Sequence, residues 1–565
     1  MDKRKIQSSS FKILIICGIF AALIYLILRT ILYFGGDHPI KEMILGLILL
    51  FCEIFVVIQG IGYLMELFSV SKIKNVQIPE EVRKSVLENP PAVTILIPSY
   101  KEPIEVIETT ILACYNMNYP NKQIVLLDDT RYDLFENSNE AEEYKKNLQT
   151  ICIRDKINLF RRKWRGAKAG IINDYLAHMR GESPPEMEFE RYDEKGSSLQ
   201  TKYIAIFDAD QNPMPDFLDE LVVKMEADPQ IAFIQTPQYY TNFLNNKVAY
   251  TASMQQIIFF EYICEGKGAK ESMFCCGTNV LFKTEALNDI KGFEEDSVTE
   301  DAATSVNLHE KGWKTAYDNK VSAFGDGPET LESYFNQQYR WALGNLGLFL
   351  TLIRKFFKNP KALSPAKWWE YALSTSHYLI GFVFIVFLLL PVIYLTFKIP
   401  GYFASVYIYA LIFIPYFAII LGTFIWTLKK RNYPAKGLFL AQWLMMASFP
   451  VYIKATFNAF LGKKGKFITT PKGKNINKNF SFKMLWPQIL FSGVAIWGLV
   501  WGISRIYFEQ RTVGSYIANA FWCLYYALII LILFYFIDPK LSYKTPNFPP
   551  NDDQKKTDST LQKEE

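Results

Sequence analysis

Apolar and polar positions divide the chain into one long polar block with membrane-length apolar stretches on either side. Each stretch is apolar over about 20 residues, the length that crosses the hydrocarbon core of a bilayer. The six stretches are Ile13–Phe34, Met43–Phe68, Ala372–Phe397, Tyr402–Leu428, Leu485–Ser504 and Ser515–Ile537. Two precede the polar block and four follow it, which predicts a multi-pass membrane protein with one large domain outside the bilayer.

Inside the polar block, short β-rich apolar runs alternate with amphipathic helical stretches. The expected strands are Ala92–Pro98, Gln123–Leu127, Lys202–Phe207 and Ile231–Gln235, and the expected helices are Ile104–Tyr115, Ala167–Met179 and Asp216–Ala227. Such alternation is typical of an α/β domain with a mostly parallel sheet, which binds its ligands at the carboxyl ends of the strands. We therefore expect the functional site at that edge.

Basic residues cluster beside the apolar stretches. The clusters are Asp2–Lys5, Ser71–Lys74, Lys429–Lys436 and Lys463–Lys478. Cytosolic flanks of membrane spans are enriched in Lys and Arg. These basic clusters therefore predict that the polar block and both termini lie in the cytosol, at a plasma or inner membrane. The stretch Gly437–Leu461 is apolar but basic on both sides, so we expect a helix in the cytosolic interface and not a seventh span.

These signals divide the chain into seven segments. They are a two-helix membrane segment (1–71), a cytosolic α/β domain (72–330), amphipathic interface helices (331–371), a membrane hairpin (372–428), an interfacial helix with a polar loop (429–484), a second hairpin (485–537) and a polar tail (538–565). The tail is rich in Lys and Glu, a composition typical of disorder.

Composition excludes several other classes of protein. The 565 residues are 50% hydrophobic, with a mean hydropathy of +0.06, which is too apolar for an ordinary soluble enzyme and too charged for a bare transporter. The net charge is only +5, and no basic patch suits a nucleic acid. Eight cysteines without CxxC spacing and four scattered histidines indicate free thiols in a reducing compartment and no histidine-ligated metal.

Two acidic pairs follow expected strands. Asp128 and Asp129 end VLLDD, where a carboxylate can accept a hydrogen bond from a base N–H or simply form a turn. Asp208 and Asp210, in FDAD, are spaced to bind Mg²⁺ or Mn²⁺ together with diphosphate oxygens, although this spacing is also common by chance. A cation there would offset the charge on a departing nucleoside diphosphate.

Two further strings lie later in the polar block. Asp301, in TED, can take a proton from an acceptor hydroxyl or stabilise the start of a helix, and one carboxylate can do both. In QQYRW, Arg340 offers a planar fork to diphosphate oxygens and Trp341 offers a flat apolar face to a sugar. An amphipathic helix at a membrane surface would use the same residue types.

In this order, VLLDD, FDAD, TED and QQYRW resemble the motifs of the processive family-2 glycosyltransferases, which include cellulose, hyaluronan and chitin synthases. Four more segments strengthen the resemblance, which is closest to the bacterial cellulose synthase catalytic subunits: PSYKEP (Pro98–Pro103), GAKAG (Gly166–Gly170), FCCGTN (Phe274–Asn279) and FITTPK (Phe467–Lys472). Gln338 stands where arginine is frequent in these enzymes. Their cyclic-dinucleotide-binding barrel has no counterpart here, so we expect no regulation by that route.

The resemblance implies a donor site, an acceptor site and a metal. The residues implied for the nucleotide sugar are Ser99, Tyr100, Glu102, Asp129, Lys168, Asp208, Arg340, Thr470 and Lys472, the last two on a gating loop. Those implied for the acceptor are Cys276, Gly277, Glu300, Gln337 and Trp341. Asp301 would be the catalytic base, and Asp208 and Asp210 would hold Mg²⁺ or Mn²⁺, with Asp210 also taking part in catalysis.

The function expected from the resemblance is that of a UDP-sugar-dependent hexosyltransferase: a processive, inverting enzyme that makes a β-glucan from UDP-glucose and moves it across the membrane. Its partners would be the UDP-sugar, the growing polysaccharide, the bilayer and an accessory export subunit. Alternatives are a synthase that uses another UDP-hexose for a hyaluronan-, chitin- or capsule-like polymer, and a non-processive lipid-linked glycosyltransferase. Glu53 and Gln59 lie mid-span, where they could line a polymer channel or pack between helices.

Overall fold

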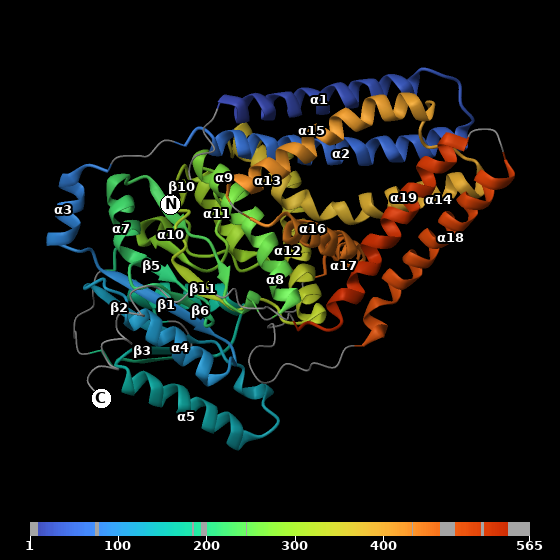
Figure 1. The fold of residues 1–565 in the computed structure, drawn as a ribbon. Helices are drawn as coiled ribbons and strands as arrows, with labels where there is room; N and C mark the ends of the chain where they lie inside the picture. The colour runs from blue at the N-terminus through green and yellow to red at the C-terminus, as the bar shows by residue number, and fades with distance from the viewer. Residues whose placement is uncertain are drawn as a thin grey trace, which may run out of the picture.

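The computed structural model describes residues 9–73, 78–183, 186–193, 201–244, 246–431, 433–463, 481–509 and 513–540. Over these residues the chain forms an α/β domain and a bundle of long helices beside it (Figure 1). Helices α1 (Ser9–Phe34) and α2 (Ile40–Val70) precede the domain in the chain, and the other long helices follow it. The FITTPK segment, with Thr470 and Lys472, and the polar tail beyond Lys540 lie outside the described residues.

The centre of the α/β domain is an eight-stranded sheet with the order β10-β7-β9-β5-β1-β2-β3-β4. Its strands are β1 (Val93–Ser99), β2 (Lys122–Asp128), β3 (Asn158–Arg162), β4 (Met187–Glu190), β5 (Tyr203–Ile206), β7 (Ile231–Gln235), β9 (Val280–Lys283) and β10 (Lys314–Tyr317). β1 runs parallel to β2 and β5, β2 to β3, and β7 to β10, whereas β4 and β9 are antiparallel to their neighbours. The mostly parallel α/β fold predicted from the sequence is confirmed.

Helices cover both faces of this sheet, which explains why its central strands are apolar throughout. Ile95 of β1 lies in one core with α4 (Ile104–Tyr115) and α7 (Phe217–Ala227). Its neighbour Leu96 lies in a second core with α6 (Ala167–Met179). Because successive side chains of a strand point to opposite faces, a strand that is covered on both sides needs apolar residues at every position.

Shorter elements complete the domain. They are the helices α3 (Glu80–Glu88), α5 (Ser138–Arg154), α8 (Lys247–Ile258), the π-helix η3 (Phe259–Cys264), α9 (Glu265–Ala269), α10 (Thr284–Asp289) and α11 (Glu300–Glu310), with a small sheet of β6 (Gln211–Pro213), β8 (Tyr239–Tyr240) and β11 (Ala323–Gly325). The long helix α12 (Leu331–Lys358) then leaves the domain and runs toward the bundle (Figure 1).

Within the described residues, six helical segments are long and apolar enough to cross a membrane. They are Ser9–Phe34, Ile40–Val70, Pro365–Phe397, Val406–Thr427, Phe482–Phe508 and Val513–Phe536. The third segment consists of α13 (Pro365–Ser376) and α14 (Ile380–Phe397). The fourth, fifth and sixth correspond to α15 (Val406–Lys430), α18 (Trp486–Phe508) and α19 (Val513–Leu531). By length and composition these are six candidate spans, and the bent pair Ala435–Ala447 and Phe449–Phe460 would be a seventh if it were one span. Large apolar side chains such as Ile27 and Trp497 are exposed on the six.

The stretch expected in the interface forms two helices and not one. α16 (Ala435–Ala447) and α17 (Phe449–Phe460) are bent by 47° at the break between them. α16 packs against α8, and α17 packs against α12 and α14, so the pair lies between the domain and the long helices (Figure 1). Its place in the cytosolic interface stays a prediction.

Candidate active site

The carboxyl ends of parallel strands bring three of the predicted motifs to one edge of the sheet. β1 and β2 end together, with Ser99 opposite Asp128, and the N–H of Asp129 donates to the carbonyl of Ser99 at 2.9 Å. β5 ends at Ile206, directly before FDAD. This edge is where ligands bind in folds of this class.

Lys168, in the first turn of α6, joins FDAD to the FCCGTN segment. Its ammonium forms an ion pair with Asp208 and donates to the carbonyl of Gly277 at 2.7 Å. The hydroxyl of Thr278 accepts a hydrogen bond from the N–H of Asp208 at 2.9 Å. Burial lowers the pKa of Lys168, but the Asp208 carboxylate outweighs burial, and the net effect is a raised pKa. The lysine is therefore charged and held against FDAD.

Gly277 also admits Asp301 to the same site. Its φ is +86°, and a Cβ there would lie 3.1 Å from Oδ2 of Asp301, so glycine suits both the backbone and the close approach. Asp301 lies in the first turn of α11, where its Oδ1 accepts from the N–H of Ala302 at 2.8 Å. The TED and FDAD carboxylates thus flank the contact between Lys168 and Gly277.

Burial makes the TED carboxyls more basic. It raises the pKa of Asp301, although the N–H of Ala302 and the charge of Lys168 oppose it. Burial and the neighbouring Asp301 together raise the pKa of Glu300 to about 7. A carboxylate with a raised pKa is a better proton acceptor at neutral pH.

The pH dependence of transfer should reflect these raised pKa values. A base must be ionised to accept a proton, so a raised pKa moves the acidic loss of activity toward neutral pH. We expect kcat/KM to rise between about pH 5 and 8, with more than one proton lost because Glu300 titrates at about 7. Initial rates measured from pH 5 to 9 test this. Glu300→Gln should retain the rise with one fewer proton, and a wild-type rate that is flat down to pH 5 would contradict it.

The helix α12 carries QQYRW against the start of α11. A Cβ at Gly344 would lie 2.3 Å from the methyl carbon of Thr299, so α12 can approach Thr299 this closely only because residue 344 is a glycine. Burial raises the pKa of Glu300 and the charge of Arg340 opposes it, which places Arg340 beside TED. Gln337 lies beside the phenol of Tyr240, and Trp341 is half-buried.

Gln338 has a packing role in this helix. It is buried, and its Oε1 accepts a hydrogen bond from the hydroxyl of Tyr452 at 3.0 Å. Tyr452 belongs to α17, so this contact ties α12 to the bent helix pair. The position that often carries arginine in cellulose synthases here stabilises helix packing.

The two aspartates of VLLDD have different surroundings. Asp128 pairs with Arg161 at 2.8 Å and accepts from the hydroxyl of Tyr132 at 2.6 Å, inside the fold. Asp129 pairs with Arg162 at 3.0 Å. Burial raises the pKa of Asp129 to about 8, and Arg162 opposes this rise. Asp129 is therefore the more suitable of the two to bind a ligand.

The PSYKEP segment lies beside Asp129. The hydroxyl of Ser99 donates to the carboxylate of Glu102 at 3.0 Å, and the N–H of Tyr100 donates to the same oxygen. In the acceptor segment, the N–H of Cys276 donates to Oε1 of Gln235 at 2.8 Å. Ser99, Asp129, Asp208 and Lys168 of the predicted donor site thus lie at the strand ends, with Gly277 and Asp301 beside them. Thr470 and Lys472 lie outside the residues that the structure describes.

Asp208 and Asp210 fit a divalent cation that is shared with a diphosphate. Both are half-buried at the end of a strand, and the Asp208 side chain is 41% exposed. Among the described residues, no group of three or more His, Cys, Asp or Glu could hold a metal. Two carboxylates supply the oxygen ligands that Mg²⁺ and Mn²⁺ prefer and leave the other positions to substrate oxygens.

Three side chains that hold the site together were not predicted: Arg162, Thr278 and Tyr240. Arg162 ends β3, the strand next to β2, so a charged pair directly after the apolar residues Leu159 and Phe160 was the available signal. Thr278 lies within FCCGTN, the segment in which only Cys276 and Gly277 were predicted to bind the acceptor. Tyr240 lies in a two-residue strand, and no local pattern indicated its contact with α12.

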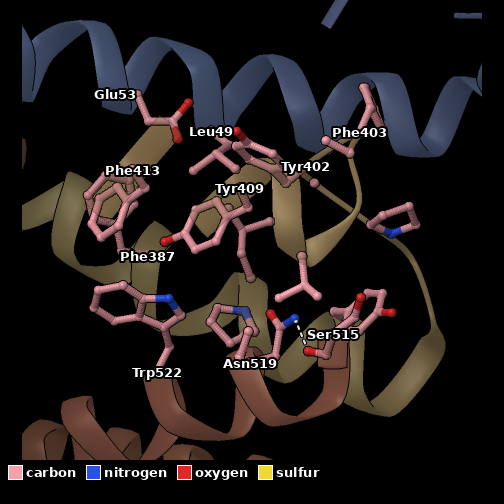
Figure 2. A pocket seen from close by; sticks show the side chains of 18 of the residues that line it. Leu49, Glu53, Phe387, Tyr402, Phe403, Tyr409, Phe413, Ser515, Asn519 and Trp522 are labelled. Atoms are coloured by element: carbon pink, nitrogen blue, oxygen red, sulfur yellow. Dashed lines mark hydrogen bonds between the residues drawn. The ribbon is translucent and has the colours of Figure 1, made fainter. Parts of the chain in front are cut away.

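A cavity of about 1070 Å³ lies in the helical bundle, apart from these motifs (Figure 2). Its lining comes from α1, α2, α14, α15, α19 and the loops that connect them. Figure 2 shows Tyr409, Phe413 and Trp522 around the open space, with Glu53 on the α2 side. Glu53 accepts from Nε of Arg29 at 2.7 Å and from the hydroxyl of Tyr25 at 2.8 Å. Glu53 therefore lines the cavity and also joins α1 to α2.

Comparisons with known proteins find related sequences. The family model described as glycosyl transferase family 2 matches residues 94–291, and the one described as glycosyl transferase family group 2 matches residues 203–428. The chain is 28% identical over 464 residues to a UDP-forming cellulose synthase catalytic subunit of Pseudomonas fluorescens, covering 79% of this chain and 56% of that protein. It is 27% identical over 458 residues to the UDP-forming cellulose synthase 1 catalytic subunit of Komagataeibacter xylinus, covering 78% and 55%.

The chain thus spans a little over half the length of these relatives. Among solved structures, a mannosyltransferase from Pyrobaculum calidifontis in complex with GDP-Man and Mn²⁺ is similar with a TM-score of 0.46 and 17% identity, covering 74% of this chain and 100% of that one.

Proposed function

Because the chain belongs to glycosyltransferase family 2 and is related to bacterial cellulose synthase catalytic subunits, we propose that it polymerises a β-glucan from UDP-glucose. One observation carries the proposal. Lys168 and Gly277 join a carboxylate pair suited to a diphosphate, Asp208 and Asp210, to a buried carboxylate suited to proton removal, Asp301. A glycosyl transfer needs both groups within one site.

In the proposed donor complex, the nucleotide lies along the strand ends. Asp129 accepts the uracil N–H, and Tyr100 and Glu102 bind beside it. Lys168 and Arg340 contact the diphosphate, where their positive charges stabilise the departing UDP. A bound Mg²⁺ or Mn²⁺, held by Asp208 and Asp210, would supply further charge neutralisation at the diphosphate.

In the proposed transfer step, Asp301 accepts the proton of the acceptor hydroxyl as its oxygen forms a bond to the anomeric carbon. The bond from that carbon to the UDP oxygen breaks on the opposite side, so the configuration inverts. The proton remains on Asp301 and the electron pair leaves with UDP. The raised pKa of Asp301 favours the proton transfer, and Trp341 supports the terminal sugar of the acceptor.

The cavity in the bundle supports the proposal that the polymer crosses the membrane. Aromatic rings such as Tyr409 and Trp522 line it, and flat apolar rings suit the C–H faces of a glucan. We place the α/β domain and both termini in the cytosol, where UDP-sugars are supplied, and the protein in the plasma or inner membrane. An accessory export subunit would receive the product on the far side.

The product made from radiolabelled UDP-glucose tests the function. Membranes containing the protein should form an ethanol-insoluble polymer that a linkage-specific β-glucanase digests. Parallel reactions with UDP-N-acetylglucosamine and UDP-glucuronate separate the chitin-like and hyaluronan-like alternatives. A product limited to one sugar on a lipid carrier would favour the non-processive alternative and overturn the proposal.

Trp341→Ala should reduce elongation more than hydrolysis of UDP-glucose. The indole is the proposed platform for the acceptor, and losing about 1.4 kcal/mol of contact corresponds to roughly a tenfold loss. Polymer length and released UDP are measured together. Trp497→Ala is the matched control, because it removes another indole, one that is 53% exposed on α18 and lies outside the cavity lining. Unchanged polymer length in Trp341→Ala would contradict the platform.

A further inference from the structure

Two arginines end β3, and each pairs with one of the two aspartates that follow one another in VLLDD. β2 and β3 are parallel, with Asp128 opposite Arg161. Nε of Arg161 lies 2.8 Å from Asp128, and Nη2 of Arg162 lies 3.0 Å from Asp129. Because successive side chains of a strand point to opposite faces, the two pairs have opposite surroundings.

The Arg161 pair belongs to the fold. Nη2 of Arg161 donates to the carbonyl of Lys145 in α5 at 2.9 Å, and Asp128 also accepts from the hydroxyl of Tyr132. These contacts tie β2 and β3 to α5. They give this pair a structural role, and they make Arg161 a matched comparison for its neighbour.

The Arg162 pair reaches into the proposed donor site. The Arg162 side chain is only 1% exposed, and its Nε lies 2.8 Å from Asp174 of α6. A Cβ at Gly170 would lie 2.9 Å from Nη2 of Arg162, so the first turns of α6 rest directly on the guanidinium. The same helix carries Lys168, which pairs with Asp208. One guanidinium therefore contacts both Asp129 and the helix that reaches FDAD.

We propose that Arg162 is a positioning residue for the nucleotide: it holds Asp129 toward the uracil N–H, lowers the pH at which Asp129 ionises, and sets the distance from Asp129 to the Lys168–Asp208 pair. The inference rests on the proposed function, since it presumes that UDP is the nucleotide. It goes beyond that function by assigning the choice of base to a residue that need not touch the ligand.

The charges around Asp129 support this role. Burial raises the pKa of Asp129, Arg162 opposes the rise and three carboxylates add to it, and the net pKa is about 8. The three carboxylates are Asp128 of β2, Asp174 of α6 and Glu102 after β1. The phenol of Tyr100 also faces Asp129. Without Arg162, Asp129 would stay protonated to higher pH, since an adjacent cation typically lowers the pKa of an aspartate by about 1–3 units.

Protonation of Asp129 changes the base that it suits. An ionised carboxylate only accepts hydrogen bonds, which matches the N–H at position 3 of uracil. A protonated carboxyl can donate, which matches the acceptor nitrogen at the same position of cytosine. By lowering the pH at which Asp129 ionises, Arg162 would thus shift the preference toward UDP and away from CDP.

The test measures dissociation constants of UDP and CDP for the full-length protein in detergent, from pH 6.5 to 9.5. In the wild type, UDP affinity should rise with pH around pH 8, the pKa of Asp129. In Arg162→Met this rise should move up by about one pH unit or more, so that UDP binds roughly tenfold more weakly at pH 7 and recovers at higher pH. The preference for UDP over CDP at pH 7 should fall in the same variant.

Three further variants separate positioning from folding. Arg161→Met should keep the wild-type pH profile even if it is less stable. Arg162→Lys keeps the positive charge but loses the planar guanidinium, so its UDP affinity should fall equally at every pH. If Arg162→Met does not fold, the pH profile of Arg162→Lys is the test. A shifted midpoint in that profile would overturn the role of the guanidinium. Asp129→Asn should bind UDP weakly with a flat profile.

Two results would overturn the inference: an Arg162→Met protein with the wild-type midpoint and UDP-to-CDP ratio, or one with an equal loss for both nucleotides at every pH. Either leaves the proposed function standing. Failure of the wild type to bind UDP would instead overturn the proposed function.

Discussion

Asp301→Asn is expected to reduce glycosyl transfer by roughly 10²–10⁴-fold, the usual contribution of a general base, while UDP binds almost as in the wild type. Asparagine keeps the size of the side chain and can still accept the N–H of Ala302 that Asp301 binds, but it cannot take a proton. The loss should appear in kcat. Turnover of UDP-glucose and the dissociation constant of UDP, measured on the same preparation, check the two parts.

Asp289→Asn is the matched control for this variant. Asp289 pairs with Lys311 at 3.6 Å with 42% of its side chain exposed, close to the far end of α11, so its substitution should leave both measurements unchanged. A parallel loss of UDP affinity and turnover in Asp301→Asn would show that Asp301 supports the fold of the site and is not the base.

Asp208→Asn should reduce the rate of glycosyl transfer by roughly a hundredfold to a thousandfold or more. Neutralisation of the leaving diphosphate by a cation contributes several kcal/mol, and about 1.4 kcal/mol is a factor of ten. Chelation with EDTA should inactivate the wild type to the same degree, and added Mn²⁺ or Mg²⁺ should restore it. The measurement is the rate as a function of cation concentration.

Two variants show whether Asp208 binds the cation or only forms the ion pair with Lys168. Lys168→Met removes the partner of Asp208 and should slow transfer without changing the Mn²⁺ concentration for half-maximal rate. Asp210→Asn should raise that concentration. Asp216→Asn is the control, since Asp216 pairs with Lys320 at the surface. Full activity of the wild type in EDTA would exclude the metal site.

Much of the α/β domain could be predicted from the sequence because its elements differ sharply in periodicity. Gln123–Leu127 and Ile231–Gln235 are continuous apolar runs, as strands buried on both faces must be. The helix Ala167–Met179 has the same bounds in the structure. β3 was missed because only Leu159 and Phe160 are apolar in it, and its arginines looked like surface residues.

The candidate site was predictable where one short string carries the chemistry. FDAD and TED stand out locally, and the structure brings Asp208 and Asp301 to either side of Gly277. Contacts between distant segments left no local signal: Lys168 and Gly277 are 109 positions apart. Gln338 illustrates the same limit, because its partner Tyr452 lies on a helix whose packing the sequence did not indicate.

The close contact between Gly344 and Thr299 has a consequence for how the enzyme responds to the membrane around it. α12 carries exposed Phe356 and Phe357 near its end, side chains that would anchor it in lipid if the helix rests on the membrane as we propose. Because Thr299 packs directly on the backbone of Gly344, which has no side chain to absorb a shift, a tilt of α12 would displace the N-cap of α11 and, with it, Asp301. Bilayer thickness and lateral tension would then set the alignment of the base, so the lipid composition would act as a modulator of turnover.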